Sequence, residues 1–385
     1  MHIELTEEQI LLRETVRRFA AEVVAPRAKR IDESGEFPLD FFHQAGELGL
    51  AGVYVPETWG GAGMDVVAYC VAIEEVSRAC ASSGVILSVN NSLVCDPLLR
   101  YATDEQKRDY LTPLASGRKL GCFALTEPEA GSDAAALRTT ARRDGDDYVL
   151  NGNKVFITNG THADLAIVFA SVDPDKKHRG ISCFVVPTDT PGFARGHHEY
   201  KLGVQASGTT ELSFSDMRVS ARQRIGEDGE GFKIAMSTLD GGRIGIAAQA
   251  IGIAEAAAAE AIAYAKQRRQ FGQPISDFQA IQFYIADMAM EIDAARLLVY
   301  KAAWAKETQK RYSLEAAQAK LFASEMAQRV TNKALQIHGG YGYTREYNVE
   351  RYFRDARITE IYEGTSEIQK LVIADWILKE TRADG

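Results

Sequence analysis

A carboxylate near the C-terminus, Glu363, stands where it could act as a base. Ile361 and Tyr362 precede it, and Gly364 directly after it gives the main chain conformational freedom. The pair Thr365-Ser366 then offers helix N-cap oxygens. Apolar residues follow this pair at helical spacing, namely Ile368, Leu371, Val372 and Trp376. The sequence therefore predicts a partly desolvated carboxylate on the turn that enters a terminal helix, with a raised pKa and stronger basicity.

The same residues also fit a carboxylate that has no chemical role. Acidic residues are favoured in the first turn of a helix because the N-terminal end of the helix dipole is positive. Glu363 and its neighbours do not by themselves separate this structural role from a catalytic one. The other stretches of the chain have to decide between the two.

Four loops rich in small and hydroxyl residues are the remaining candidates for a binding site. They span residues 122–133, 156–160, 268–274 with Gln279, and 336–342. Thr126 and its neighbouring amides could bond the polar edge of a ring, and Phe156 and Thr158 point to the same side of a strand. Gly339 could let the main chain approach a phosphate. Each loop alone also fits an ordinary turn, strand end or helix C-cap.

Several common functional motifs do not occur in the sequence. It has no G-x-G-x-x-G, P-loop or G-x-S-x-G pattern, which argues against a Rossmann dinucleotide site, a phosphate loop and a nucleophile elbow. The seven histidines never pair at i,i+4, so we predict no metal site. The net charge of -9, without a compensating basic run, argues against a nucleic-acid partner.

Composition points to a soluble globular protein in a reducing compartment. Hydrophobic residues make up 46% and charged residues 25% of 385, which is ordinary for a globular chain of two or three domains. The five cysteines form no C-x-x-C pair, which favours free thiols in a bacterial cytoplasm or a mitochondrial matrix. We see no signal or transit peptide, and no apolar run that approaches membrane-spanning length.

The first 120 residues have helical periodicity. Thr6 and Gln9 form a capping box that opens a helix expected to end at Pro26. Further helices are predicted over 39–49 and 65–81, and a second capping box at Thr103 opens a helix that ends near residue 117. Between these helices, the polar residues 90–92 interrupt an apolar stretch. They either line a cavity or are satisfied amides in the core, which is the commoner case.

The period changes after residue 120 and changes back after residue 229. Residues 148–157 predict a β-hairpin with Asn151-Gly152 in a type I′ turn. Further strands over 165–170, 181–186 and 211–214 complete a small antiparallel sheet or barrel. Long helices are then expected over 231–267, 277–308 and 313–338, followed by the terminal helix, and together they form a bundle. We therefore predict three domains, at 1–120, 121–229 and 230–385.

Taken together, these stretches closely resemble the acyl-CoA dehydrogenases, and among them the short-chain (butyryl-CoA) type. The residues that carry the resemblance are 124–128 and 130–133, 156–160, 268–272, 336–340 and 361–367. The resemblance covers essentially the whole chain and implies an α+β fold with an all-helical N-terminal domain, a small antiparallel β domain and a C-terminal four-helix bundle. It also implies a homotetramer, as a dimer of dimers, that binds FAD. Such enzymes desaturate an acyl-CoA between its α and β carbons and pass electrons to an electron-transferring flavoprotein.

The resemblance also implies roles for individual residues, with Glu363 as the base that removes the α proton. It implies FAD contacts at Phe123, Leu125, Thr126, Gly131, Ser132, Phe156, Ile157, Thr158, Arg268, Phe271, Gln279, Gln336, Ile337, Gly339, Gly340, Thr365, Ser366 and Glu367. Of these, Arg268, Gln279 and residues 336–340 would reach the diphosphate and adenosine across a subunit interface. Acyl-CoA contacts are implied at Ser132, Asp240, Arg243 and Gly364. Phe156 is a departure, because many relatives carry Trp there, but a phenyl ring still stacks on a flavin.

Three positions bear on the acyl group. The isovaleryl-CoA and long-chain enzymes place their base at the position that matches Gly242, and the glutaryl-CoA type carries an Arg at the position that matches Gly84. Neither feature is present, so we expect a straight chain of about four to six carbons, each buried methylene contributing about 0.8 kcal/mol while there is room. Cys95-Asp96 departs from the short-chain enzymes. We expect Asp96 to be a helix-surface or turn residue, and a pocket reshaped for a branched or alicyclic acyl group is the alternative.

Two other functions are alternatives to the dehydrogenase. A flavin oxidase on the same fold would pass electrons to oxygen, although the chain length matches the dehydrogenases rather than the longer acyl-CoA oxidases. A non-catalytic helical scaffold or binding protein would have no use for Glu363, Thr158 and Arg268 together. A flavin spectrum separates an enzyme from a scaffold, and the rate of reoxidation in air separates an oxidase from a dehydrogenase.

Overall fold

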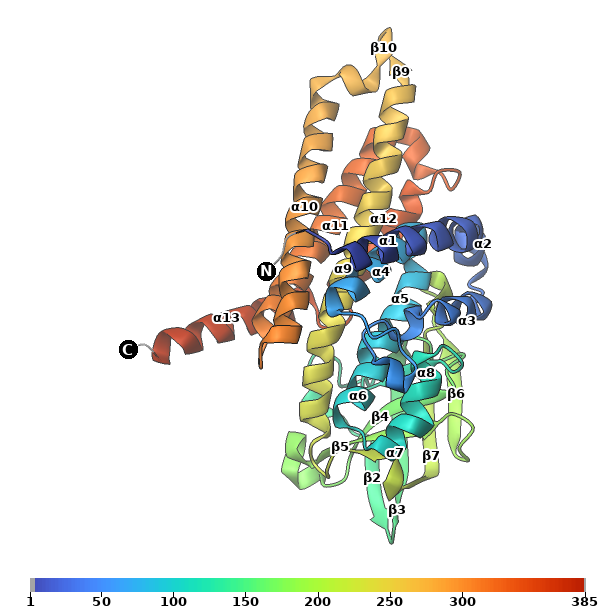
Figure 1. Ribbon diagram of the computed structural model, residues 1–385, viewed down its shortest axis with the longest axis vertical. Helices are drawn as coiled ribbons and strands as arrows, with labels where there is room; N and C mark the ends of the chain where they lie inside the picture. The colour runs from blue at the N-terminus through green and yellow to red at the C-terminus, as the bar shows by residue number, and fades with distance from the viewer. Residues whose placement is uncertain (1–3, 384–385) are drawn as a thin grey trace.

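Helices form the first part of the fold. The structure is a computed structural model and describes residues 4–383. Its first helices, blue to cyan in Figure 1, cover one side of the molecule. They are α1 (Glu7–Phe19), α2 (Ala25–Ser34), α3 (Leu39–Glu47), α4 (Val66–Ala79), α5 (Ala81–Ser88), α6 (Asp96–Tyr101), α7 (Asp104–Gln106) and α8 (Thr112–Ala115). π-helical turns at Ala20–Val24, Val89–Cys95 and Lys107–Leu111 join several of them into longer rods.

The predicted helix starts are confirmed, but the predicted end at Pro26 is wrong. Thr6 and Gln9 form the capping box, with the Gln9 amide donating to the Thr6 hydroxyl at 3.3 Å and the Thr6 amide to the Gln9 side chain at 2.9 Å. The chain passes Pro26 without leaving the helix, through the π-helical turn Ala20–Val24 and into α2. Pro26 lies in the first turn of α2, where its missing N–H removes little hydrogen bonding.

The polar residues inside the apolar stretch are satisfied core amides. Asn90 donates to main-chain carbonyls and accepts from the Gly121 amide at 3.1 Å. Asn91 likewise donates to two carbonyls and accepts from the Val53 amide at 2.8 Å. Both side chains are fully buried, so their bonds hold the turns around them together and leave no polar cavity.

The middle of the chain is a sheet whose strands follow the order β6-β7-β3-β2-β4-β5-β8, with β1 paired to β4. Its strands are β1 (Gly121–Ala124), β2 (Thr140–Asp144), β3 (Asp147–Ile157), β4 (Leu165–Ser171), β5 (Ile181–Pro187), β6 (Phe193–His198), β7 (Thr210–Ser220) and β8 (Arg224–Ile225). Most neighbours are antiparallel, as predicted, but β4 pairs in parallel with both β1 and β2. Strand β1 lies parallel to β4, and the chain leaves the sheet after Ala124 into the rest of the 122–133 loop.

The hairpin turn was predicted at the wrong place. The turn between β2 and β3 falls at Gly145, where φ is +67°, and the register pairs Asp144 with Asp147. Asn151 and Gly152 lie inside β3, at a bulge where the pairing with β7 shifts. A Cβ on Gly152 would lie 2.4 Å from the Thr139 hydroxyl oxygen, so this glycine serves a close approach rather than a turn.

The last part of the chain is a bundle built on one long central helix. Its elements are α9 (Gly231–Gln267), the hairpin β9 (Arg269–Gln270) and β10 (Gln273–Pro274), α10 (Gln279–Thr308), α11 (Ser313–His338), α12 (Val349–Arg357) and α13 (Ser366–Ala383). Helices α9, α10 and α11 pack side by side, while α13 extends away from the body (Figure 1). The hairpin forms one tip of the molecule, and the sheet lies near the opposite end of α9.

Helix α9 corrects one expectation from the sequence. It is long and apolar enough to cross a membrane by length and composition, although no such run was expected. In the fold, 72% of its most apolar window is buried, because the helices of the bundle and α4 pack around it. Ile234 and Ile246 of α9 also share a hydrophobic core with Leu93, Leu125 and Ile167. This shared core fixes the sheet and the 122–133 loop against α9.

Candidate active site

Glu363 lies on the turn between the 3-10 helix Ile358–Glu360 and α13, as the sequence predicts. Its backbone has φ of +52°, and Gly364 follows with φ of +96°. A left-handed conformation costs a residue other than glycine about 1–3 kcal/mol and persists only where its surroundings impose it. The turn at Glu363 is therefore held in place by other parts of the protein.

Two side chains hold this turn. The Lys320 ammonium on α11 donates to the Gly364 carbonyl at 2.7 Å. The Gln369 side-chain amide on α13 donates to the same carbonyl at 2.8 Å and to the Glu363 carbonyl at 3.4 Å. Because both carbonyls are fixed, the Glu363 side chain leaves the main chain in a defined direction, toward α9.

The Glu363 carboxylate has the electrostatics of a base. Its Oε2 atom is buried and accepts no hydrogen bond from the described residues. Burial raises the pKa of Glu363 to about 7, although Lys320 and Arg243 nearby oppose the rise. A carboxyl placed only to suit a helix dipole would have a lowered pKa. The geometry therefore favours the catalytic interpretation, since a base works best with a pKa near the working pH.

Glycines on α9 make room for this carboxylate. A Cβ on Gly242 would lie 2.1 Å from Glu363 Oε2 and 2.7 Å from Leu93 Cδ2. One turn further along α9, a Cβ on Gly245 would lie 2.1 Å from the Tyr69 hydroxyl oxygen. A side chain at position 242 would thus take the space of the Glu363 carboxylate. A base can therefore stand at position 242 or at position 363, but not at both.

We expect Gly242→Ala to lower kcat/KM by about 100-fold, because displacing a catalytic group by about 1 Å has an effect of that size. Steady-state kinetics at equal flavin content measure the loss. Gly241→Ala is the matched control, since a Cβ there first meets Lys306 Nζ, at 2.9 Å, and not Glu363. A Gly242→Ala enzyme as active as the Gly241→Ala control would show that the carboxylate does not need this space.

Asp240 and Arg243 form an ion pair on the same part of α9. The Arg243 guanidinium donates to Asp240 Oδ1 at 2.6 Å, and the Ser313 hydroxyl donates to Asp240 Oδ2 at 2.5 Å. Burial raises the pKa of Asp240, and Arg243 opposes the rise. The Arg243 Nε atom is buried without a partner among the described residues. A donor is thus left over beside Glu363, where a substrate carbonyl or phosphate oxygen could accept it.

The sheet brings the two predicted flavin loops together. The Val155 amide donates to the Thr126 carbonyl at 2.9 Å, so the 122–133 loop runs beside the end of β3. Phe156 has φ of +58° and is 64% exposed, an unusual state for a large apolar side chain. Leu125 and Ile157 are buried in the core, so their side chains do not face a ligand.

A buried ion pair that the sequence did not reveal anchors these loops. Lys154 on β3 is fully buried and donates to Glu127 Oε1 at 2.7 Å and to the Leu125 carbonyl at 3.1 Å. Glu127 also accepts from the amides of Arg138 and Thr139. Burial lowers the pKa of Lys154 to about 8, which Glu127 opposes. Since polar residues inside strands usually face solvent, only the three-dimensional structure shows this lysine in the core.

Four more of the predicted cofactor residues line a separate pocket at the tip of the bundle. Arg268, Ile337, Gly339 and Gly340 line a cavity of about 520 Å³ together with Tyr341. The Arg268 guanidinium lies 5.5 Å from the centre of the Tyr341 ring. A Cβ on either glycine would meet no atom within 4 Å, so this wall of the pocket is open.

The two groups of residues are far apart in one chain. Arg268 follows Gly242 by 26 positions (268 minus 242), and α9 is helical up to Gln267. At 1.5 Å per residue, Gly242 beside the base and Arg268 at the tip lie about 39 Å apart. The base and the tip pocket therefore lie near opposite ends of this stretch of α9.

Three family models match the chain in succession. They describe the acyl-CoA dehydrogenase N-terminal domain at residues 6–118, the middle domain at 122–217 and the C-terminal domain at 229–378. A probable acyl-CoA dehydrogenase of Bacillus subtilis is 53% identical over 380 residues, which cover 98% of this chain and 100% of the relative. The mitochondrial short-chain specific acyl-CoA dehydrogenase of Bos taurus is 52% identical, covering 99% and 92%. The chain belongs to the acyl-CoA dehydrogenase family.

Solved structures agree with this assignment. Butyryl-CoA dehydrogenase from Megasphaera elsdenii superposes with a TM-score of 0.97 at 47% identity, covering 98% of this chain and 100% of the other. A chain from a study of the electron transferring flavoprotein of Acidaminococcus fermentans superposes equally well at 49% identity, with the same coverage. The predicted family and its α+β fold are confirmed.

Acyl-CoA dehydrogenases are FAD-dependent oxidoreductases that act on CH–CH groups, and the residues of this chain fit that cofactor. The exposed face of Phe156 suits an aromatic ring, as it lies beside the polar Thr126 loop. The open wall at Gly339 and Gly340, with the cation of Arg268, suits a diphosphate. These observations support the predicted cofactor on physical grounds as well as by family.

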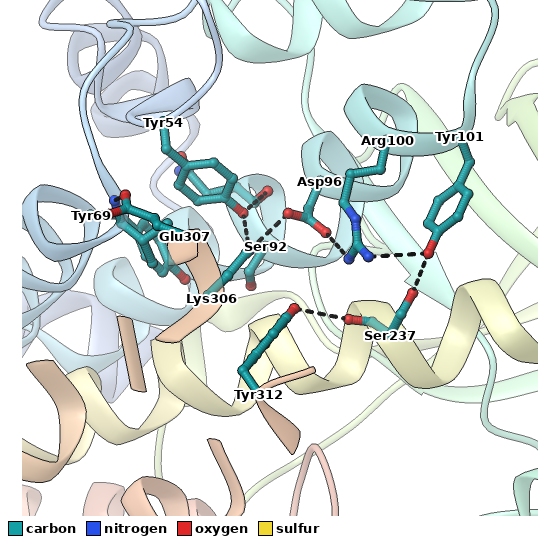
Figure 2. Close-up of polar contacts among 12 residues, drawn as sticks. Tyr54, Tyr69, Ser92, Asp96, Arg100, Tyr101, Ser237, Lys306, Glu307 and Tyr312 are labelled. Atoms are coloured by element: carbon teal, nitrogen blue, oxygen red, sulfur yellow. Dashed lines mark hydrogen bonds and ion pairs between the residues drawn. The ribbon is translucent and has the colours of Figure 1, made fainter. Parts of the chain in front are cut away.

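The expectation for Asp96 is wrong. Asp96 is only 2% exposed and lies between Lys306 Nζ at 2.8 Å and the Arg100 guanidinium at 3.3 Å. Figure 2 shows it inside a polar network that runs from Tyr54 to Tyr101, between the first helices and the bundle. Lys306 is 210 positions further along the chain, so nothing near Asp96 in the sequence reveals the pair. Both carboxylate oxygens are engaged, which leaves Asp96 no free oxygen with which to reshape an acyl pocket.

We expect Lys306→Met to lower the free energy of unfolding by about 3–5 kcal/mol, because it leaves the buried Asp96 carboxylate without its main partner. Urea titration measures the change. Lys379→Met removes an exposed partner of Asp375 and should cost under about 1 kcal/mol. Equal losses in the two variants would contradict the role given to the buried pair.

Proposed function

We propose that this acyl-CoA dehydrogenase converts a short straight-chain acyl-CoA into its trans-2-enoyl-CoA. The observation that carries the proposal is the buried, unbonded carboxylate of Glu363 against Gly242. The short-chain enzymes among its relatives, about half identical over nearly the full length, support the chain length of the substrate. An electron-transferring flavoprotein is the proposed acceptor, in keeping with the neighbour from Acidaminococcus fermentans.

Separate residues remove the proton, stabilise the developing charge and hold the substrate. Glu363 takes the α proton of the thioester, and its own main-chain N–H donates to the thioester oxygen as negative charge develops there. One preorganised donor of this kind contributes about 3–4 kcal/mol. Asp240, Arg243, Ser132 and Gly364 hold the coenzyme A part of the substrate. Bound FAD supplies the acceptor for the hydride that leaves the β carbon.

The cofactor would be shared between two chains. Phe123, Thr126, Phe156, Thr158 and the start of α13 would hold the flavin of one chain's FAD. The tip pocket of a second chain would hold the diphosphate and adenosine of the same FAD. Within one chain, α9 keeps Gly242, beside the base, about 39 Å from Arg268 at the tip. Two such chains, each completing the site of the other, make a symmetric dimer.

An exposed apolar face of α10, separate from the shared cofactor sites, supports a dimer of dimers. Four large apolar residues of α10 are exposed at intervals of seven, namely Phe283, Met290, Leu297 and Trp304. This spacing places them on one face of the helix, as in helices that pack against a partner helix. A face of this kind is rare on a monomer and marks a contact with another protein chain. A homotetramer covers both this face and the shared cofactor sites.

Further features set limits on the proposal. We propose that the enzyme divides into domains at about residues 120 and 229, and that it works in a bacterial cytoplasm or a mitochondrial matrix. The five buried free cysteines fit a reducing compartment. We expect neither nucleic acid nor a membrane among its partners, given the net charge of -9.

The substrate is tested by kcat/KM across a series of thioesters: butyryl-, hexanoyl-, octanoyl-, isobutyryl-, 2-methylbutyryl-, cyclohexanecarboxyl- and glutaryl-CoA. We expect the maximum at four to six carbons, where methylenes still find apolar contacts. We expect glutaryl-CoA to be rejected, because its distal carboxylate would be buried without a cationic partner. An arginine has no room at position 84, where a Cβ would lie 2.0 Å from Ser77 Oγ. A maximum at octanoyl-CoA or beyond, or on a ring or branch, would show that the substrate class is wrong.

A flavin oxidase on the same fold remains the alternative function. Substrate-reduced enzyme would separate the two, by comparing its reoxidation in air with reoxidation by an electron-transferring flavoprotein. We expect slow reoxidation in air and rapid reoxidation by the flavoprotein. The reverse order would assign the chain to the oxidases while leaving Glu363 as the base.

A further inference from the structure

A lysine that the mechanism above does not use lies directly beneath the base. Lys320, on α11, is fully buried, and its ammonium makes one hydrogen bond with the described residues, to the Gly364 carbonyl at 2.7 Å. No carboxylate within the described residues approaches it closely enough for an ion pair. A buried ammonium with so few partners is costly to the folded state, so burial lowers the pKa of Lys320 to about 7, although Glu363 opposes the fall. Such a group calls for a functional explanation.

Its position gives it two effects on Glu363. The bond to Gly364 helps to hold the left-handed backbone of Glu363, together with Gln369. The ammonium also places a positive charge beside a carboxylate that burial would otherwise keep protonated. Lys320 lies on α11 and Glu363 on the turn before α13, so the packing of α11 against α13 sets their separation.

The other charges around Lys320 are few. Arg243 approaches from α9, Glu360 from the turn before Glu363, and Glu367 from the first turn of α13. Glu360 bonds Arg357, and Glu367 is exposed at the surface, so both interact weakly with the buried pair. Arg243 is engaged by Asp240 at 2.6 Å. Lys320 is therefore the cation near Glu363 that is free of a counter-ion among the described residues.

We propose that Lys320 is a positioning residue that fixes the turn carrying Glu363 and, when protonated, favours the ionised form of the Glu363 carboxylate. The inference rests on the proposed role of Glu363 as the base. It differs from that role because Lys320 touches only the main chain of the turn and acts on the reaction through Glu363.

The test separates the charge of Lys320 from its hydrogen bond. Lys320→Met removes both, Lys320→Arg keeps the charge, and Gln369→Leu removes the other bonds to the turn without changing any charge. The readout is the pH dependence of kcat/KM with butyryl-CoA, whose acidic limb reports the protonation of the base in the free enzyme. A second readout is infrared absorption of the protonated carboxyl, taken as the difference between each protein and its Glu363→Gln counterpart.

Losing a nearby cation raises the pKa of a carboxyl, so the acidic limb of Lys320→Met should move to higher pH. We expect a shift of about one pH unit, which is about a tenfold loss of kcat/KM on the acidic side and little loss from this cause at high pH. The infrared titration should move by the same amount. Lys320→Arg should keep the wild-type limb, and Gln369→Leu should lose activity at every pH with the limb unmoved.

A Lys320→Met enzyme whose limb and infrared titration coincide with those of wild type overturns the proposal. Lys320→Gln carries the same test if the Met variant does not fold, and a wild-type limb there would overturn it equally. Failure of the proposed function looks different, because then wild type itself shows no activity with short acyl-CoA, or Glu363→Gln keeps it.

Discussion

Glu363→Gln should reduce flavin bleaching by butyryl-CoA by several orders of magnitude while FAD and acyl-CoA still bind. Glutamine keeps the shape and the hydrogen bonding of the side chain but has no useful proton affinity. Since Glu363 Oε2 has no partner among the described residues, the amide replaces no existing contact. The measurement is stopped-flow absorbance of the flavin after mixing with excess substrate.

The matched control is Glu360→Gln, three positions earlier, at the end of the 3-10 helix that precedes the turn. Glu360 pairs with the half-exposed Arg357 and does not touch Glu363, so its loss should change the bleaching rate less than twofold. Near-normal bleaching by Glu363→Gln would remove Glu363 from the mechanism. A slow Glu360→Gln enzyme would show instead that the whole turn is sensitive to charge.

The pH dependence of the wild-type enzyme follows from the same carboxyl. A base must be ionised, and burial raises the pKa of Glu363 to about 7. Thus kcat/KM should fall about tenfold per pH unit below this pKa and level off above it. The limb should report Glu363 in the free enzyme, before bound substrate removes further water from the site.

Arg268→Ala should weaken FAD binding and the proposed tetramer together. Arg268 lines the tip pocket with Gly339 and Gly340. Its guanidinium would face the diphosphate of the FAD whose flavin is held by a neighbouring chain. The loss of one charge-assisted contact to a phosphate costs about 1.5–3 kcal/mol, which lowers FAD affinity by about ten- to a hundredfold. Flavin absorbance after gel filtration measures the cofactor, and light scattering on the same column measures the mass.

Lys266→Ala is the control for this variant. Lys266 is an exposed cation on the last turn of α9, two positions before Arg268, and does not line the pocket. Its loss should leave both flavin content and mass unchanged. Full flavin and a tetrameric mass in Arg268→Ala would show that the pocket at the tip does not hold the diphosphate.

Features that depend on neighbouring residues were predictable from the sequence. Capping boxes at Thr6 and Thr103 begin helices as predicted, and Asp65 caps α4. The turn at Glu363 likewise follows from the apolar pair before it and the glycine after it. These signals act within a few residues, where propensity and capping decide the conformation.

The errors concern contacts between distant parts of the chain. Asn151-Gly152 has the composition of a turn, but pairing with β7 places it in a bulge inside a strand. Asp96 and Lys320 look like surface residues because charged side chains are usually exposed. Their burial depends on partners far along the chain, Lys306 and Gly364, which no local pattern reveals. Sequence spacing likewise could not show that Gly242 gives its space to Glu363.

The length of α9 has a genetic consequence. Suppose that each cofactor is held by two chains. A Glu363→Gln chain then lacks the base and an Arg268→Ala chain lacks the diphosphate contact, which are at opposite ends of the site. A mixed dimer of the two contains one site with both defects and one site with neither. Co-expression of the two inactive variants should therefore restore up to half the activity per mixed dimer, and two loss-of-function alleles in one cell would complement each other.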